Sequence, residues 1–180
     1  MLGSLPPELI LINLIVLGIA MTMHEFAHNY VGHLMGDPVP KSQGRLTLNP
    51  LVHINWVGWL MFAIVGFGIL GSAPISPQRM RNPRWGFLAA VAAGPLSNLG
   101  LAIVFAIFAR IFLSVGDIPQ FVALFLYMSV FWNVLLFVFN ILPFFPIDGW
   151  HIVLSLLPGR WLNVMQIPVF IQQNLRPVGR

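Results

Sequence analysis

Hydrophobic residues in this chain fall into long runs that short polar stretches separate. The runs cover about residues 9–35, 56–71, 85–113 and 119–140. A helix needs about 20 apolar residues to cross the hydrocarbon core of a bilayer, so the pattern predicts a polytopic membrane protein. The first run continues into a helix without a small-residue cleavage site, which favours a retained span over a signal peptide.

The polar stretch after the first run has a different pattern. Residues 36–55 contain prolines, glycines and a short alternation of polar and apolar side chains at 45–48. Alternation of this kind indicates a strand, and the prolines and glycines indicate turns. We therefore expect a small strand or hairpin insertion after the first helix.

The C-terminal part of the chain is expected to be less regular. Residues 143–149 hold two prolines, too many for a regular helix, and a short helix over about 149–157 follows. Residues 161–175 are apolar in patches but broken by a proline, which suits an interfacial helix better than a span. We predict a single transmembrane core over 1–160 and an interfacial tail over 161–180.

The composition supports this fold class. Hydrophobic residues make up 58% of the chain and charged residues only 8%, whereas about a quarter of a soluble domain is charged. The expected fold is therefore an all-α polytopic membrane protein with about four to six membrane helices and the small insertion. The chain has no cysteine, which excludes disulfides, thiolate metal ligands and thiol nucleophiles.

The formal net charge of +4 comes from nine Lys and Arg, most of them between the runs. In a soluble protein this excess would favour nucleic acid, but here it indicates flanking charges that orient a membrane protein. Lys41 and Arg45 indicate that one side of the membrane is cytosolic. The arginine-rich loop over 79–84 indicates the opposite side if residues 56–71 form a span. The face of Lys41, where Arg160 should also emerge, is expected to be cytosolic.

The first span contains the motif His24-Glu25-Phe26-Ala27-His28, which has the form H-E-x-x-H. On a helix, His24 and His28 lie one above the other, so both imidazoles can reach one metal, while Glu25 can hold and deprotonate a water. The alternative is that neighbouring carbonyls simply satisfy two helix histidines. Ionisable groups in a membrane span are expensive and usually functional, which favours the metal site.

A catalytic zinc site needs a third protein ligand and an open position for water. Glu8, Asp37 and Asp117 sit at span ends, where solvated charges are expected. Asp148 lies deep in apolar sequence after the proline-rich segment, which makes it the best third ligand. An N-cap of the following helix is the alternative role for Asp148, and the two roles are compatible.

Three motifs follow one another along the chain: HEFAH at 24–28, GPLSN at 94–98 and NILPFFPIDG at 140–149. In this order they resemble the site-2 protease family of intramembrane metalloproteases, in a minimal prokaryotic form without a PDZ or CBS domain. Two further stretches, GRLTLNP at 44–50 and NPRWG at 82–86, are similar to prokaryotic members of that family.

The resemblance implies one zinc ion per chain, bound by His24, His28 and Asp148. It implies that Glu25 is the general base in the attack of a zinc-bound water on a peptide bond. The implied substrates are membrane proteins, cut in or near a transmembrane segment. The implied location is a prokaryotic cell membrane, with the active site reached from the cytosolic side and no role for nucleic acid.

Four other polar residues lie in or near the predicted spans. Asn98 and Asn140 could each donate an amide N–H to the oxyanion that forms during hydrolysis, and the resemblance favours Asn140 because it shares a motif with Asp148. A helix-packing hydrogen bond is the favoured role for Asn98 and an equal alternative for Asn140. His151, three residues after Asp148, suits packing better than a place behind the ligands, and His53 is assigned no role.

Other membrane functions compete with the metalloprotease. A serine protease would need an exposed serine with a histidine partner, and an aspartyl protease would need two aspartates within the membrane, where only Asp148 qualifies. A metal transporter or a non-catalytic metal-binding scaffold is the remaining alternative. Glu25 argues for a hydrolase, because a transporter has no need of a water-activating carboxylate beside its first histidine.

Overall fold

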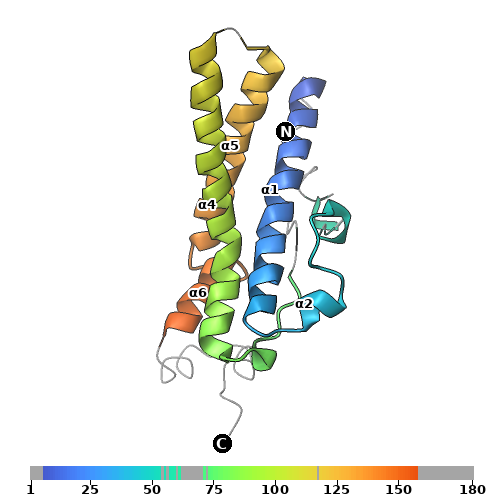
Figure 1. Cartoon of the computed structure of the whole chain (residues 1–180), viewed down its shortest axis with the longest axis vertical. Coiled ribbons are helices and arrows are strands. Elements are labelled where there is room, and N and C mark those ends of the chain that lie inside the picture. The colour runs from blue at the N-terminus through green and yellow to red at the C-terminus, as the bar shows by residue number, and fades with distance from the viewer. Residues whose placement is uncertain are drawn as a thin grey trace, which may run out of the picture.

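The computed structural model describes residues 6–53, 55, 57–59, 61, 71, 73–116 and 118–157, and within them all regular elements are helices (Figure 1). Three of these helices are long and apolar enough to cross a membrane: α1 (Pro7–Leu34), α4 (Pro83–Val115) and α5 (Gln120–Ile141). The shorter elements are α2 (Val39–Ser42), η2 (Pro50–Val52), η3 (Pro77–Arg79) and α6 (Asp148–Leu156).

Prolines and caps set the ends of the long helices. α4 begins with Pro83 in its first turn, where a missing N–H costs nothing, and the Asn82 side chain accepts a hydrogen bond from the Trp85 backbone N–H at 3.2 Å. α5 ends at Ile141, just before the chain turns extended at Leu142 and enters Pro143. A residue that precedes proline is disfavoured in helical conformation, which explains this boundary.

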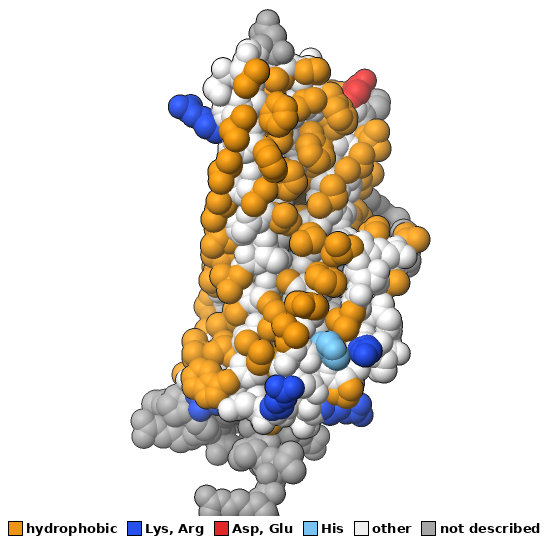
Figure 2. Space-filling model, viewed as in Figure 1, with side chains coloured by type: hydrophobic (Ala, Val, Ile, Leu, Met, Phe, Trp, Pro, Cys, Tyr) orange, Lys and Arg blue, Asp and Glu red, His pale blue; other side chains and the backbone are white. Residues whose placement is uncertain are grey.

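The long helices form a bundle in which α4 contacts both α1 and α5, and α1 also contacts α5 (Figure 1). The short helix α6 returns against α4 and α5. Large apolar side chains remain exposed along the flanks of the bundle, and Figure 2 shows them in orange over most of its length. Such a surface is stable against lipid and not against water.

Residues 45–48 do not form the expected strand. The loop instead satisfies its polar groups locally. The Arg45 backbone N–H donates to Pro40 O at 2.8 Å, and the Arg45 guanidinium donates to Val52 O. The Asn49 backbone N–H donates to the Thr47 hydroxyl at 3.2 Å. These hydrogen bonds within the loop replace strand pairing. The alternation of polar and apolar residues does not reveal such local bonds, which compete with regular structure.

Asp37 is buried, although a solvated charge was expected at this position. Its two carboxylate oxygens accept hydrogen bonds from the backbone N–H groups of Val39 at 3.0 Å and Ser76 at 2.6 Å. The Arg81 backbone N–H also donates to Met35 O at 2.9 Å. The start of the segment after α1 is therefore tied to the residues that lead into α4.

These ties bring five basic residues to one end of the bundle, whereas Arg110 lies near the other end of α4. A single crossing by residues 56–71 would have put the two groups of charges on opposite sides of the membrane. The bonds from Ser76 to Asp37 and from Arg81 to Met35 instead bring the start of α4 beside the end of α1, so that both groups lie at the same end. Figure 2 shows blue side chains collected at this lower end. We call it the basic end, and it contains Lys41, Arg45, Arg79, Arg81 and Arg84.

Arg84 also joins the basic end to α6. Its guanidinium donates to the carbonyls of Ser155 at 2.7 Å and of Leu156 and Leu157 at 3.0 Å each. These are the carbonyls of the last two residues of α6 and of its C-cap, which have no partner within the helix, so a cation is well suited to them. The far end of α6 carries Asp148.

Some expectations fall on residues that the structure does not describe. Most of the proposed span over 56–71 and the whole tail over 161–180 lie outside the described residues. The expected number of four to six membrane helices is therefore tested only for the three spans named above.

Candidate metal centre

Two histidines on α1 face each other within the bundle. His24 and His28 are one turn apart, and both side chains are buried. The two Nε2 atoms lie 2.9 Å apart, and the ring centroids lie 4.5 Å apart. The rings are nearly perpendicular, at 88°, so that both nitrogens point to a common point.

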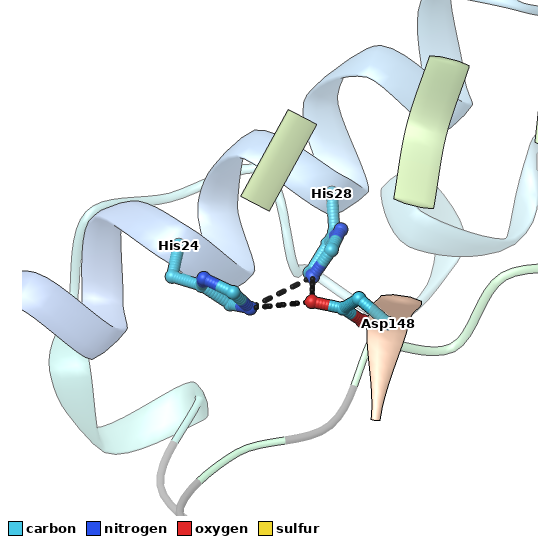
Figure 3. Close-up of side chains that lie close together, drawn as sticks. All are labelled: His24, His28 and Asp148. Atoms are coloured by element: carbon cyan, nitrogen blue, oxygen red, sulfur yellow. Dashed lines mark hydrogen bonds and ion pairs between the residues drawn. The ribbon is translucent and has the colours of Figure 1, made fainter. Parts of the chain in front are cut away.

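Asp148 reaches the same point from the start of α6 (Figure 3). Its Oδ2 atom lies 3.1 Å from His24 Nε2 and 3.3 Å from His28 Nε2. Residues 143–147 between α5 and α6 are non-helical, as the prolines predicted. This irregular connection brings an acid from late in the chain back to the middle of α1.

The other nitrogens of the two imidazoles are engaged on α4. His24 Nδ1 lies 2.7 Å from Asn98 Oδ1, and His28 Nδ1 lies 2.8 Å from Ala90 O. Carbonyl oxygens only accept hydrogen bonds, so each Nδ1 carries the proton and donates it. Each Nε2 is left with a lone pair that points at the other histidine and at Asp148.

Three electron-pair donors therefore meet with no proton between them. Such a group is repulsive on its own and suits a cation. In a tetrahedral zinc site with Zn–N bonds of about 2.0–2.1 Å, neighbouring donors lie about 3.3 Å apart. The observed separations of 2.9, 3.1 and 3.3 Å fit this geometry with small adjustments. Two histidines and one carboxylate also leave a fourth position open, as in catalytic zinc sites.

Asn98 connects the three long helices behind this cluster. It is 0% exposed, and its side-chain NH₂ donates to Ala20 O at 3.2 Å and to Asn133 Oδ1 at 3.0 Å. Asn133 in turn donates to Ser129 O at 2.8 Å. Asn98 therefore joins the helices, as expected, and also accepts a hydrogen bond from His24. Partners that orient a metal-binding histidine in this way commonly tune its affinity.

Sequence reasoning missed Asn133 and the Ala90 carbonyl. A signal for Asn133 existed, because an amide within an apolar span needs a partner there. Ala90 acts through its backbone and leaves no trace in the residue type.

Gly94, in the GPLSN motif, lets α4 pass close to the histidines. A Cβ atom added there would lie 2.3 Å from His28 Nε2 and 2.8 Å from His24 Nε2, far inside van der Waals contact. Any side chain at this position would collide with the cluster, so the glycine is a steric requirement of the site.

Glu25 is buried, at 4% exposure, beside the two histidines in sequence. Its Oε2 atom has no hydrogen-bond partner among the described residues. The backbone of Gly71 lies against it, since a Cβ atom added to Gly71 would meet Glu25 Oε1 at 2.4 Å. A buried carboxyl oxygen that is free to accept a proton is what a general base requires.

Asn140 and His151 are not joined to the cluster by any hydrogen bond within the described part of the chain. The Asn140 amide donates to Leu136 O at 2.9 Å, inside its own helix, and its oxyanion role stays a prediction. His151 packs edge-on against Phe87 with ring centroids 5.8 Å apart, and its Nδ1 has no partner there.

Comparison with known proteins gives two relatives. The chain is 35% identical over 161 residues to "Putative zinc metalloprotease YwhC" of Bacillus subtilis (strain 168), a match that covers 86% of this chain and 71% of that protein. It is 27% identical over 145 residues to "Putative zinc metalloprotease Rip2" of Mycolicibacterium smegmatis, covering 73% of this chain and 51% of that protein. No family model and no solved structure matches the chain.

The close approach at Gly94 can be tested by substitution. Gly94→Ala should displace the histidines and remove most of the zinc from the purified protein, as measured by elemental analysis. Gly100→Ala is the matched control on the same helix, because a Cβ atom there has nothing within 4 Å. Equal zinc content in the two variants would show that α4 is not held against the histidines.

Proposed function

Because this chain belongs to the site-2 protease family of zinc metalloproteases, we propose that it hydrolyses peptide bonds in or near the transmembrane segments of other membrane proteins. The observation that carries the proposal is the meeting of three buried lone pairs inside an apolar bundle, next to a carboxyl oxygen that has no partner among the described residues. The first provides a place for a metal, and the second provides a base.

His24, His28 and Asp148 are the proposed zinc ligands, one ion per chain. A zinc ion bound there supplies a Lewis acid and makes a water acidic enough to lose a proton near neutral pH. The histidine lone pairs that would bind the metal are already oriented toward it. Asn98 and Ala90 O fix the histidine tautomers, so the lone pairs need no rearrangement before they bind.

Glu25 is the proposed general base. It takes a proton from the attacking water and returns it to the amine nitrogen of the leaving segment, which balances the hydrolysis. Asn140 is the proposed amide donor to the oxyanion. Its present bond to Leu136 O lies within its own helix, so this role requires the amide to exchange that partner for the substrate.

The depth of the site supports a substrate within the membrane. The chain is an integral membrane protein, and its described residues include three helices that are long and apolar enough to cross a membrane. Ten residues separate His24 from the end of α1 at Leu34, which is about 15 Å of helix and half of a hydrocarbon core of roughly 30 Å. By the positive-inside rule the basic end lies in the cytosol, and we propose that water and zinc enter from that side.

A membrane metal transporter or a non-catalytic metal-binding protein is the alternative function. Both would use the same three ligands. Neither function requires a second, unpaired carboxylate beside the ligands. Glu25 supplies one, because its buried Oε2 atom has no hydrogen-bond partner among the described residues. Proteolysis by the purified protein therefore separates the two readings.

Removal of the third ligand tests the metal site. Asp148→Ala should lower the zinc content of the purified protein well below one ion per chain, because two imidazoles alone make a weak site. Asp148→Asn keeps the size of the side chain but not the charge, and it should also lose affinity. Unchanged zinc in both variants would mean that another residue completes the site.

Removal of the base tests the reaction. Purified protein in lipid is incubated with a panel of membrane-span peptides, with and without a zinc chelator, and the products are identified by mass spectrometry. Cleavage should need zinc, and Glu25→Gln should keep zinc but lose at least about 100-fold in rate. Zinc-loaded parent protein that cuts no peptide would favour the alternative function, and cleavage by Glu25→Gln at the parent rate would exclude Glu25 as the base.

The orientation can be tested by labelling, because the chain has no cysteine of its own. Lys41→Cys places a thiol at the basic end, and Ser114→Cys places one at the last turn of α4, at the opposite end. A membrane-impermeant maleimide added to intact cells should label only the Ser114→Cys variant. The reverse labelling pattern would place the basic end outside the cytosol.

A further inference from the structure

A groove lies between α4 and α5 at the end of the bundle opposite to the basic end. It has a volume of about 610 Å³, and both helices and the turn between them line it. The side chains that border the space are small, with Ala106 and Ala109 on α4 and Ala123 on α5. Beside these alanines the rings of Phe105 and Phe125 pack edge-on, with centroids 6.0 Å apart. Bulky side chains therefore separate the two helices next to the place where small ones line the gap.

The groove has the length of one leaflet of a bilayer. On α5 its lining runs from Gln120, the first residue of the helix, to Val130. Ten residues of helix rise about 15 Å, which is half of a hydrocarbon core of roughly 30 Å. A transmembrane helix of another protein would need a contact surface through both leaflets. The short groove is better suited to the acyl chain of a single lipid.

The groove has one charged side chain among its described lining residues, Arg110 on α4. The residue is exposed, and its guanidinium has no hydrogen bond or ion pair with any residue that the structure describes. The large side chains around it on α4 are exposed and apolar: Ile107, Phe108, Ile111 and Phe112. A cation in such an apolar belt is costly unless an anion reaches it.

Arg110 lies close to the level where lipid phosphates are found. Five residues separate it from Val115, the last residue of α4, which is about 7.5 Å of helix. A long arginine side chain extends toward the membrane surface while its methylene groups stay in apolar surroundings. Guanidinium groups bind phosphate through paired, charge-assisted hydrogen bonds. A partner for the cation and an apolar channel for a chain thus occur side by side.

We propose that this groove binds one anionic phospholipid of the leaflet opposite to the basic end, with its phosphate at Arg110 and one acyl chain between α4 and α5. A zwitterionic headgroup would bring a second cation beside the guanidinium, and none of the described residues that line the groove is acidic. An anionic headgroup is therefore preferred. This lipid site is independent of the proposed protease activity and lies on other residues than the metal centre.

The charge of Arg110 can be tested by lipid retention. Protein is reconstituted in vesicles with equal parts of phosphatidylglycerol and phosphatidylcholine that have the same acyl chains, extracted in mild detergent, and analysed by native mass spectrometry. The parent protein should retain about one phosphatidylglycerol per chain in preference to phosphatidylcholine. Arg110→Gln should lower this retention about fivefold, and Arg110→Lys should keep most of it because the charge remains.

Lys41→Gln is the matched control for this measurement, because it removes an exposed positive charge from the basic end. It should retain phosphatidylglycerol at the parent level. Equal retention of the two lipids by the parent protein would overturn the proposal, since it indicates only the unspecific lipid that surrounds any membrane protein. An equal loss in Lys41→Gln and Arg110→Gln would overturn it as well.

The place of the acyl chain can be tested by filling the groove. Ala106→Phe puts a ring into the space from an exposed position, so retention of phosphatidylglycerol should fall as far as in Arg110→Gln. Ile107→Phe is the matched control, because Ile107 is exposed on the same helix and is not among the lining residues. Equal retention in the two variants would show that the chain does not lie between α4 and α5.

A further measurement uses the parent protein and needs no variant to fold. Phosphatidylglycerol with a photoreactive diazirine on its acyl chain should label peptides that contain residues 106–113 and 120–130, and unlabelled phosphatidylglycerol should compete better than phosphatidylcholine. Labelling spread evenly over α1, α4 and α5 would overturn the proposal. Gln120→Cys tests the competing occupant, a second copy of the chain: rapid disulfide formation between two copies in vesicles, without labelling at the groove, would assign the surface to that copy instead.

Discussion

The direction of two imidazole protons determines the chemistry of this molecule. Asn98 Oδ1 and Ala90 O accept the Nδ1 protons of His24 and His28, and both acceptors lie on α4. The Nε2 lone pairs are consequently turned inward, where Asp148 adds a third. Three converging lone pairs repel one another unless a cation lies between them, so the packing of α4 on α1 also determines the affinity for metal.

Close backbone approach makes this packing possible. Gly94 leaves room for the histidines, and Gly149 leaves room for the chain that turns back after α5. A Cβ atom at Gly149 would lie 2.1 Å from Leu142 O. The acid of the cluster can therefore sit directly beside the end of the helix that precedes it.

The sequence predicted the three described spans and the meeting of His24, His28 and Asp148 for the same reason. Long apolar runs have few alternatives, and an ionisable residue within them is conspicuous, so His24, His28 and Asp148 could be selected before their contacts were known. The strand over 45–48 was wrong because Arg45 and Thr47 bond within their own loop. Asp37 was misjudged because its partner, Ser76, is remote in sequence. Hydrogen bonds of this type depend on the folded chain and not on residue pattern.

The Arg84 guanidinium and the Asp148 carboxylate lie at opposite ends of α6, so the length of this helix sets the distance between them. The helix has nine residues, or about 13 Å, between the carbonyls that Arg84 holds and the carboxylate at the cluster. The distance between the metal ligands and the basic end is therefore set by the protein and not by the thickness of the lipid bilayer. Bilayers of different thickness can change how far the bundle protrudes, but they leave the length of the path from the basic end to the cluster unchanged.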